Sequence, residues 1–142
     1  MSLNPPSALL LTAFEHLSTA VLVFGSSGGV LAMNPAAESM LKLSARQTVG
    51  THIGRLVARA NACLALIDAA LERRQVLSEA ALELTLLDGR VILADCTVSP
   101  LPESGGFLME LVDVEQRLRV TREEQLLAQN ESTRVVLRGL AH

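Results

Sequence analysis

The last residue of the chain, His142, is the side chain best suited to covalent chemistry. An imidazole is a good nucleophile near neutral pH and can hold a phosphoryl group before passing it to a carboxylate. Gly139, three residues upstream, costs the interior of a helix about 1 kcal/mol relative to alanine, so its presence calls for a reason such as the close approach of another backbone. The alternative is that both residues simply occupy a frayed chain end.

The two cysteines and the two other histidines show no spacing that predicts a site. Cys63 and Cys96 are too far apart for a CxxC motif, and we interpret them as small buried side chains of a protein in a reducing cytoplasm. His16 is expected at the boundary of an apolar helix face. His52 follows a Gly-Thr pair in a connection, so we expect it to be exposed.

The carboxylates also lack the pairing that acid–base or metal chemistry needs. Glu38, Asp68, Glu72 and Asp95 have neither paired-carboxylate nor metal-ligand spacing, and we interpret them as solvated charges. Gly28-Gly29 could suggest a phosphate loop, but neither GxxxxGK[ST] nor GxGxxG surrounds it, so a turn is predicted. The sequence therefore predicts no metal site and no nucleotide site.

Composition limits the class of protein. The chain has 142 residues with a net charge of −3, enough for one domain with a real core. The only lysine is Lys42, and 2% of the residues are aromatic, which argues against nucleic-acid binding. No apolar run approaches the roughly 18 residues of a membrane span, and no basic residue precedes the first apolar run as in a signal peptide. We therefore expect a cytoplasmic protein with no nucleic-acid or membrane partner.

Hydrophobic periodicity predicts an α+β domain with a five-stranded antiparallel sheet. A short helix capped by Ser7 comes first, and residues 34–74 are expected to be helical or connecting, with a helix start at Asn34-Pro35 and a longer helix over Asn61–Arg74. Alternation of apolar and polar residues, with turn residues such as Asp88-Gly89 between the runs, predicts the strands. These strands are Ala20–Phe24, Val30–Met33, Ala80–Leu87, Val91–Ser99 and Phe107–Val112.

The segment from Val114 to His142 has a different character, with no glycine or proline before Gly139. A continuous helix of this length would extend roughly 40 Å, more than a small sheet needs as cover. Heptad spacing predicts a weak two-stranded coiled coil, because several seam positions are polar. The alternative is an amphipathic helix that folds back on the domain. The seam positions are Val114, Leu118, Thr121, Gln125, Ala128, Ser132 and Val135.

Several motifs resemble those of PAS sensory domains. Asn34-Pro35-Ala36-Ala37-Glu38-Ser39-Met40-Leu41 is similar to the NxAxxxL entry to the first PAS helix. The hairpin at Asp88-Gly89 and the exit Leu111-Val112-Asp113-Val114 before a helix also resemble this family. The ending Leu137-Arg138-Gly139-Leu140-Ala141-His142 resembles the opening of the H-box in NtrB-type nitrogen-regulation sensor histidine kinases, in which EIKNPL follows RGLAH.

This resemblance implies a PAS-like sheet with helices on one face, an N-terminal helix and a long C-terminal helix. It divides the chain into an arm and helix (1–18), a PAS sensory domain (19–113) and a signalling and dimerisation helix (114–142). His142 would be the phosphoacceptor of an ATP-dependent protein-histidine kinase, of which this chain is an N-terminal, inactive part. ATP and Mg would bind elsewhere in that kinase. The implied partners are a second copy of the chain, an NtrC-type response regulator and a PII-type signal protein.

A PAS-like sheet can enclose a ligand cavity, which leaves a second function open. Residues that could line it are Val21, Val23, Ile92, Cys96, Phe107 and Met109. A filled core is favoured, because no polar groups converge on these faces. Haem and flavin are not expected, since the helix Asn61–Arg74 has no histidine and Cys63 lacks the flanking pattern of photosensing PAS domains. The alternatives are a small-molecule-binding sensor and a pure protein-interaction scaffold.

Overall fold

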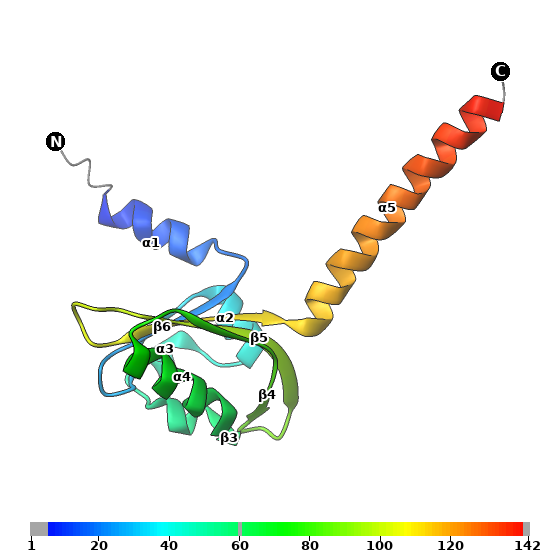
Figure 1. Cartoon of the computed structure of the whole chain (residues 1–142). Helices are drawn as coiled ribbons and strands as arrows, with labels where there is room; N and C mark the ends of the chain where they lie inside the picture. Colours follow the sequence, from blue (N-terminus) through cyan, green and yellow to red (C-terminus); the bar gives the residue numbers. More distant parts are fainter. Residues whose placement is uncertain (1–5, 60, 141–142) are drawn as a thin grey trace.

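The computed structural model describes residues 6–59 and 61–140. One antiparallel sheet forms the centre, the helices α2, α3 and α4 cover one of its faces, and α1 and α5 project from the domain (Figure 1). The elements, in chain order, are α1 (Ser7–Glu15), β1 (Ala20–Phe24), β2 (Val30–Met33), α2 (Pro35–Leu41), α3 (Ala45–Thr48), a 3₁₀ turn (Ile53–Arg55), β3 (Val57–Arg59), α4 (Asn61–Arg73), β4 (Leu77–Leu86), β5 (Val91–Pro100), β6 (Phe107–Asp113) and α5 (Val114–Leu140).

The sheet has the strand order β2-β1-β6-β5-β4-β3, with antiparallel pairing between neighbours. The α+β fold class with its five predicted strands is confirmed. The structure adds β3, so the prediction that residues 34–74 hold only helices and connections is wrong at this point. Val57 pairs with Leu86 and Arg59 with Thr85. This three-residue strand is too short to show alternation, and pairing with β4 forms it.

Side chains that alternate along the strands form the core beneath the helices. Cys96 stands opposite Leu111, Val98 opposite Met109, and Leu22 also opposite Met109, so these residues share the inner face. Phe24 and Phe107 stack there with ring centroids 4.6 Å apart. The inner face thus carries packed apolar side chains, which form the core with the helices above them.

The predicted cavity lining is wrong for two residues of β1. Val21 stands opposite Glu110 and Val23 opposite Leu108, on the face away from the helices. Their neighbours in β1, Leu22 and Phe24, point inward instead. When every residue of a strand is apolar, the sequence does not reveal which alternate residues face the core. In β1, the pairing with β6 decides this.

Asn34 joins the start of β1 to the start of α2. Its side-chain oxygen accepts hydrogen bonds from the N–H of Ala37 (3.0 Å) and of Val21 (2.9 Å), and its amide nitrogen donates to the carbonyl of Thr19 (2.8 Å). The residue is fully buried. The asparagine of the NxAxxxL motif is therefore a helix cap, as predicted, and also a cross-link between two elements.

A bulge in β4 explains why this strand begins earlier than predicted. Glu79 pairs with Cys96 and Leu82 with Ala94, so two residues of β4 lie opposite the single residue Asp95. The second bulge residue, Ala81, has φ +51°. The bulge shifts the phase of alternation, and for that reason Leu77–Glu79 did not continue the predicted pattern.

The two projecting helices bury little. No residue of α1 is buried, and residues 115–131 of α5 are all exposed. A 27-residue helix is about 40 Å long, and α5 extends away from the sheet instead of folding back on it (Figure 1). Ser7 does not cap α1 as predicted, because Pro6 holds the cap position and accepts from Leu9 and Leu10. None of the described helices combines the length and apolar character that a bilayer span requires.

Candidate functional site: the junction between the sheet and helix α5

The structure does not bring the sequence-predicted chemical residues together at one site. His142 lies outside the described residues. His16 ends the N-terminal helix, where its Nδ1 lies 2.8 Å from the carbonyl oxygen of Thr12. His52 is exposed, as predicted, and its Nδ1 accepts a hydrogen bond from the N–H of Gly54. Both histidines thus contact backbone groups of their own segments.

The feature that connects the domain to the rest of the chain is the junction of β6 and α5. The strand ends at Asp113 and the helix begins at Val114, with no residue between them. Asp113 Oδ1 accepts a hydrogen bond from the N–H of Glu115 at 2.8 Å. An aspartate before the first helical residue stabilises free N–H groups of the first turn, so Asp113 fixes where the strand becomes a helix.

A second carboxylate holds the helix from the neighbouring strand. Asp95 of β5 forms an ion pair with Arg117 of α5, with 3.0 Å between Oδ2 and Nε. Its other oxygen accepts a hydrogen bond from the N–H of Ala81 in the β4 bulge at 2.9 Å. Asp95 therefore ties β4, β5 and the first turns of α5 together.

Asp95 and Glu38, interpreted from the sequence as solvated charges, are half-buried, and each also makes a specific contact within the domain. Glu38 accepts a hydrogen bond from the N–H of Ala45 at 3.0 Å and so stabilises the start of α3. Asp68 and Glu72 are exposed on α4, as expected of solvated charges, and neither forms an ion pair with the described residues. Sequence spacing carried no signal for Asp95, because its partner lies on an element whose direction is set by tertiary structure.

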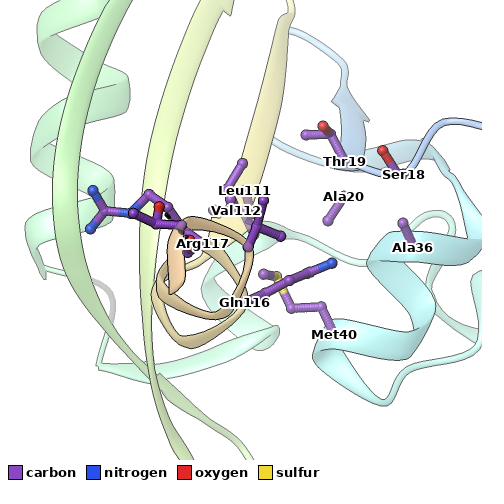
Figure 2. A pocket seen from close by; sticks show the side chains of 11 residues that line it. Ser18, Thr19, Ala20, Ala36, Met40, Leu111, Val112, Gln116 and Arg117 are labelled. Carbon is purple, nitrogen blue, oxygen red and sulfur yellow. Dashed lines mark hydrogen bonds between the residues drawn. The ribbon is translucent and has the colours of Figure 1, made fainter. Parts of the chain in front are cut away.

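A groove of about 300 Å³ opens beside the root of α5. Figure 2 shows the side chain of Gln116 pointing toward α2, whereas the guanidinium of Arg117 points the other way, over the sheet. Its lining includes both apolar and polar side chains. The lining residues are Ser18, Thr19, Ala20, Ala36, Met40, Leu111, Val112, Gln116, Arg117, Val120 and Thr121.

A second groove, of about 510 Å³, lies at the same root against β5. Its apolar side chains include Val91, Leu93 and Leu118, which are 56%, 46% and 46% exposed. The first turns of α5 thus lie between two shallow apolar grooves. They contact β5 and β6, but residues 115–131 of the helix remain exposed.

The contacts that the structure shows at this junction are the helix cap by Asp113 and the ion pair between Asp95 and Arg117. Among the side chains that the structure describes, those of residues 6–56 and 62–131, no group of three or more His, Cys, Asp or Glu is placed to hold a metal ion. Every buried side-chain nitrogen or oxygen of these residues has a hydrogen-bond partner.

An antiparallel sheet with helices on one face that runs directly into a long C-terminal helix defines the PAS class of domains. The chain belongs to the PAS fold family, whose model matches residues 14–119. Among curated proteins it resembles the sensory histidine kinase/phosphatase NtrB of Vibrio alginolyticus, with 29% identity over 144 residues. It also resembles the NtrB of Klebsiella oxytoca, with 29% identity over 128 residues. The resemblance to NtrB-type kinases expected from the sequence is confirmed.

The chain spans less than half the length of these relatives. The match covers 100% of this chain and 40% of the Vibrio protein, and 90% of this chain and 36% of the Klebsiella protein. Among solved structures, the PAS domain of nitrogen regulation protein NR(II) from Vibrio parahaemolyticus is 23% identical, with a TM-score of 0.65 over 75% of this chain and 98% of that domain. At this identity the structural likeness shows the fold.

Proposed function

We propose that the chain is the sensory and dimerisation module of a two-component histidine kinase of nitrogen regulation. The observation that carries this proposal is the direct passage of β6 into α5, stabilised by Asp113 and by the ion pair between Asp95 and Arg117. A strand in the middle of the sheet thus continues directly into a long projecting helix, so a movement of β6 also moves the start of α5. The NtrB relatives support the class of kinase.

In this proposal His142 is the phosphoacceptor. The sequence Leu137–His142 supplies an imidazole in the context that resembles the H-box, and an imidazole can carry a phosphoryl group to an aspartate. ATP and Mg would bind in another part of the kinase and supply the phosphoryl group. The PAS domain then controls how easily that part reaches His142.

The proposed control is a two-state equilibrium in the direction of α5. A change in the sheet moves Asp95 and Asp113, and these two carboxylates hold the first turns of the helix. The grooves on both sides of the root leave room for a tilt. A signal shifts the equilibrium only by its difference in affinity for the two helix directions.

Dimerisation is proposed to use the two projecting helices. Leu9, Leu10 and Leu11 of α1 are 57%, 56% and 62% exposed, and Leu126 and Leu127 of α5 are 59% and 64% exposed. Apolar surface of this kind on helices that bury nothing in the domain favours association with another helix. A second copy of the chain, related by a two-fold axis, supplies such helices.

The partners outside the dimer follow from the class of kinase. We propose an NtrC-type response regulator as the acceptor of the phosphoryl group and a PII-type protein as a regulator, both acting through the parent kinase in the cytoplasm. The similarity to NtrB proteins supports this part of the proposal.

The test uses the complete kinase that contains this chain. Radiolabelled ATP should label the kinase, and His142→Gln should reduce the labelling to background. His16→Gln is the matched control, because it makes the same substitution at an exposed histidine far from His142 in the sequence, and it should leave the labelling unchanged. Equal labelling of the His142→Gln variant and the unaltered kinase would overturn the proposal.

A further inference from the structure

The first half of β4 lies at an open edge of the sheet. β3 pairs only with the last two residues of β4, and residues 77–84 have no strand on that side in the part of the chain that the structure describes. On its other side, this half pairs with β5 through the bulge opposite Asp95. The bulge residues Ala80 and Ala81 are both exposed. A change of pairing here therefore breaks no second ladder.

The bulge holds Ala81 in a strained conformation, with φ +51°. A residue with a Cβ is disfavoured in this left-handed region, which glycine adopts freely. Asp95 lies between the buried Ala94 and Cys96 in β5, so its side chain points to the outer face of the sheet. There its Oδ1 accepts a hydrogen bond from the N–H of Ala81 at 2.9 Å, and its Oδ2 pairs with Arg117. One carboxylate thus holds both the strained bulge and the root of α5.

The start of β4 has a second way to pair with β5. In the observed register, Ser78 stands opposite Thr97, and Leu77 packs against the core. Without the bulge, the regular pairing of the second half of β4 would continue to its start, and Thr97 would stand opposite Glu79. A shift of one residue moves every side chain to the other face, so Ser78 would turn inward and Leu77 outward.

The energies of the two registers oppose each other. The observed register buries part of Leu77 and allows the hydroxyl groups of Ser78 and Thr97 to hydrogen-bond at 2.8 Å. The second register loses both contacts but relieves the left-handed conformation of Ala81. The observed register is therefore the more stable one, and the strain at Ala81 narrows the difference.

We propose that residues 77–81 of β4 form a register switch that controls how firmly α5 is held. In the second register the N–H of Ala81 lies in the plane of the sheet and no longer reaches the Asp95 carboxylate on the outer face. Asp95 then keeps only Arg117, and its side chain gains freedom, so the helix root loosens. The link from this switch to the output of a kinase rests on the proposed function, whereas the two registers do not.

Nuclear magnetic resonance of the full 142-residue chain tests the register directly. In the unaltered chain we expect the contact between Ser78 and Thr97, together with relaxation dispersion at residues 77–81 from exchange with the second register. Ala81→Gly should reduce the minor population about tenfold, because glycine adopts the left-handed conformation without strain. Ala81→Val should replace the Ser78–Thr97 contact by one between Glu79 and Thr97, because valine is strongly disfavoured at positive φ.

Ala80→Gly is the matched control. Ala80 is the other bulge residue and has no positive φ, so glycine there should leave the minor population within about twofold of that in the unaltered chain. The register switch is overturned if the unaltered chain shows no exchange at residues 77–81, or if a folded Ala81→Val chain keeps the contact between Ser78 and Thr97. If Ala81→Val does not fold, equal effects of Ala81→Gly and Ala80→Gly overturn the switch, and the expected difference between them supports it.

Hydrogen exchange in α5 tests the coupling through Asp95. Ala81→Val should speed exchange at the amides of residues 116–120 about threefold, and Ala81→Gly should slow it, because the carboxylate holds the helix root only in the bulged register. Ala81→Val should add little in an Asp95→Asn chain, since the ion pair with Arg117 is already lost there. The coupling is overturned if neither substitution at Ala81 changes this exchange, or if the effect of Ala81→Val is as large in the Asp95→Asn chain.

The complete kinase tests the link to output. We expect the labelling rates of the Ala81→Gly and Ala81→Val kinases to differ about threefold, in line with their opposite effects on the register. Equal rates in two variants that differ in register would overturn this link. If His142→Gln labels normally, the proposed function fails, and the resonance measurements still decide the register switch.

Discussion

The Nε atom of Arg117 lies 3.0 Å from Oδ2 of Asp95, so the first turns of α5 are joined to a strand in the interior of the sheet. The Asp95 side chain is 27% exposed and the Arg117 side chain 47% exposed. A pair this exposed to solvent contributes about 0–1 kcal/mol to stability. The ion pair therefore contributes little to the stability of the domain, and its main effect is to position the first turns of α5 against β5.

Asp95→Asn should loosen the root of α5 with little effect on the domain. An asparagine keeps an oxygen for the N–H of Ala81 but loses the charge that attracts Arg117. We expect the free energy of unfolding to change by less than about 1 kcal/mol. Hydrogen exchange at the amides of residues 116–120 should become faster, because local opening of the helix root becomes easier.

The matched control is Glu83→Gln, which removes an exposed carboxylate from β4. Glu83 makes no ion pair in the described part of the chain, and its removal should leave exchange in α5 unchanged. If Asp95→Asn and Glu83→Gln give the same exchange rates in α5, the ion pair does not hold the helix.

Asn34→Ala should destabilise the domain by about 2–4 kcal/mol, measured by chemical unfolding. The substitution leaves the N–H groups of Val21 and Ala37 and the carbonyl of Thr19 without their partner, and a buried unsatisfied group costs about 1–3 kcal/mol. Asn130→Ala on the exposed face of α5 is the control, with an expected change within about 0.5 kcal/mol. A small effect at Asn34 would show that water replaces these hydrogen bonds.

Gly106→Ala should cost about 3 kcal/mol, because a Cβ at this position would overlap the carbonyl oxygen of Phe24. Backbone atoms of β1 cannot move aside without disturbing the core. At Gly25, in contrast, a Cβ would meet only Leu31 at an ordinary distance of 3.7 Å. The melting temperature of Gly25→Ala should therefore stay close to that of the unaltered chain, and equal losses in the two variants would contradict this explanation.

Local sequence signals were sufficient for most of the fold. Alternation predicted the inner faces of β5 and β6, and Asn34-Pro35 predicted the start of α2, because these features depend on a few neighbouring residues. Asp88-Gly89 correctly predicted a turn, in which Gly89 has φ +88° and the N–H of Leu86 donates to the carbonyl of Arg90.

Features that depend on pairing between distant segments could not be predicted. The parity of β1 was hidden in an uninterrupted apolar run, and the bulge opposite Asp95 shifted the pattern of β4. The contact of Asp95 with Arg117 joins residues on different elements, whose relative positions no local rule supplies. The role of His142 stays a prediction.

The proposed dimer predicts that Leu10→Gln weakens self-association without weakening the fold. Leu10 is 56% exposed on a helix that buries nothing in its own domain, so the free energy of unfolding of the monomer should not change. Burial of one leucine contributes about 1.5–3 kcal/mol, so its loss from an interface should raise the dimer dissociation constant about tenfold or more in sedimentation equilibrium. Leu87→Gln is the control, since Leu87 is similarly exposed (61%) but lies in the β4–β5 turn and not on a projecting helix. An unchanged dissociation constant for Leu10→Gln, or an equal change in both variants, would exclude α1 from the interface.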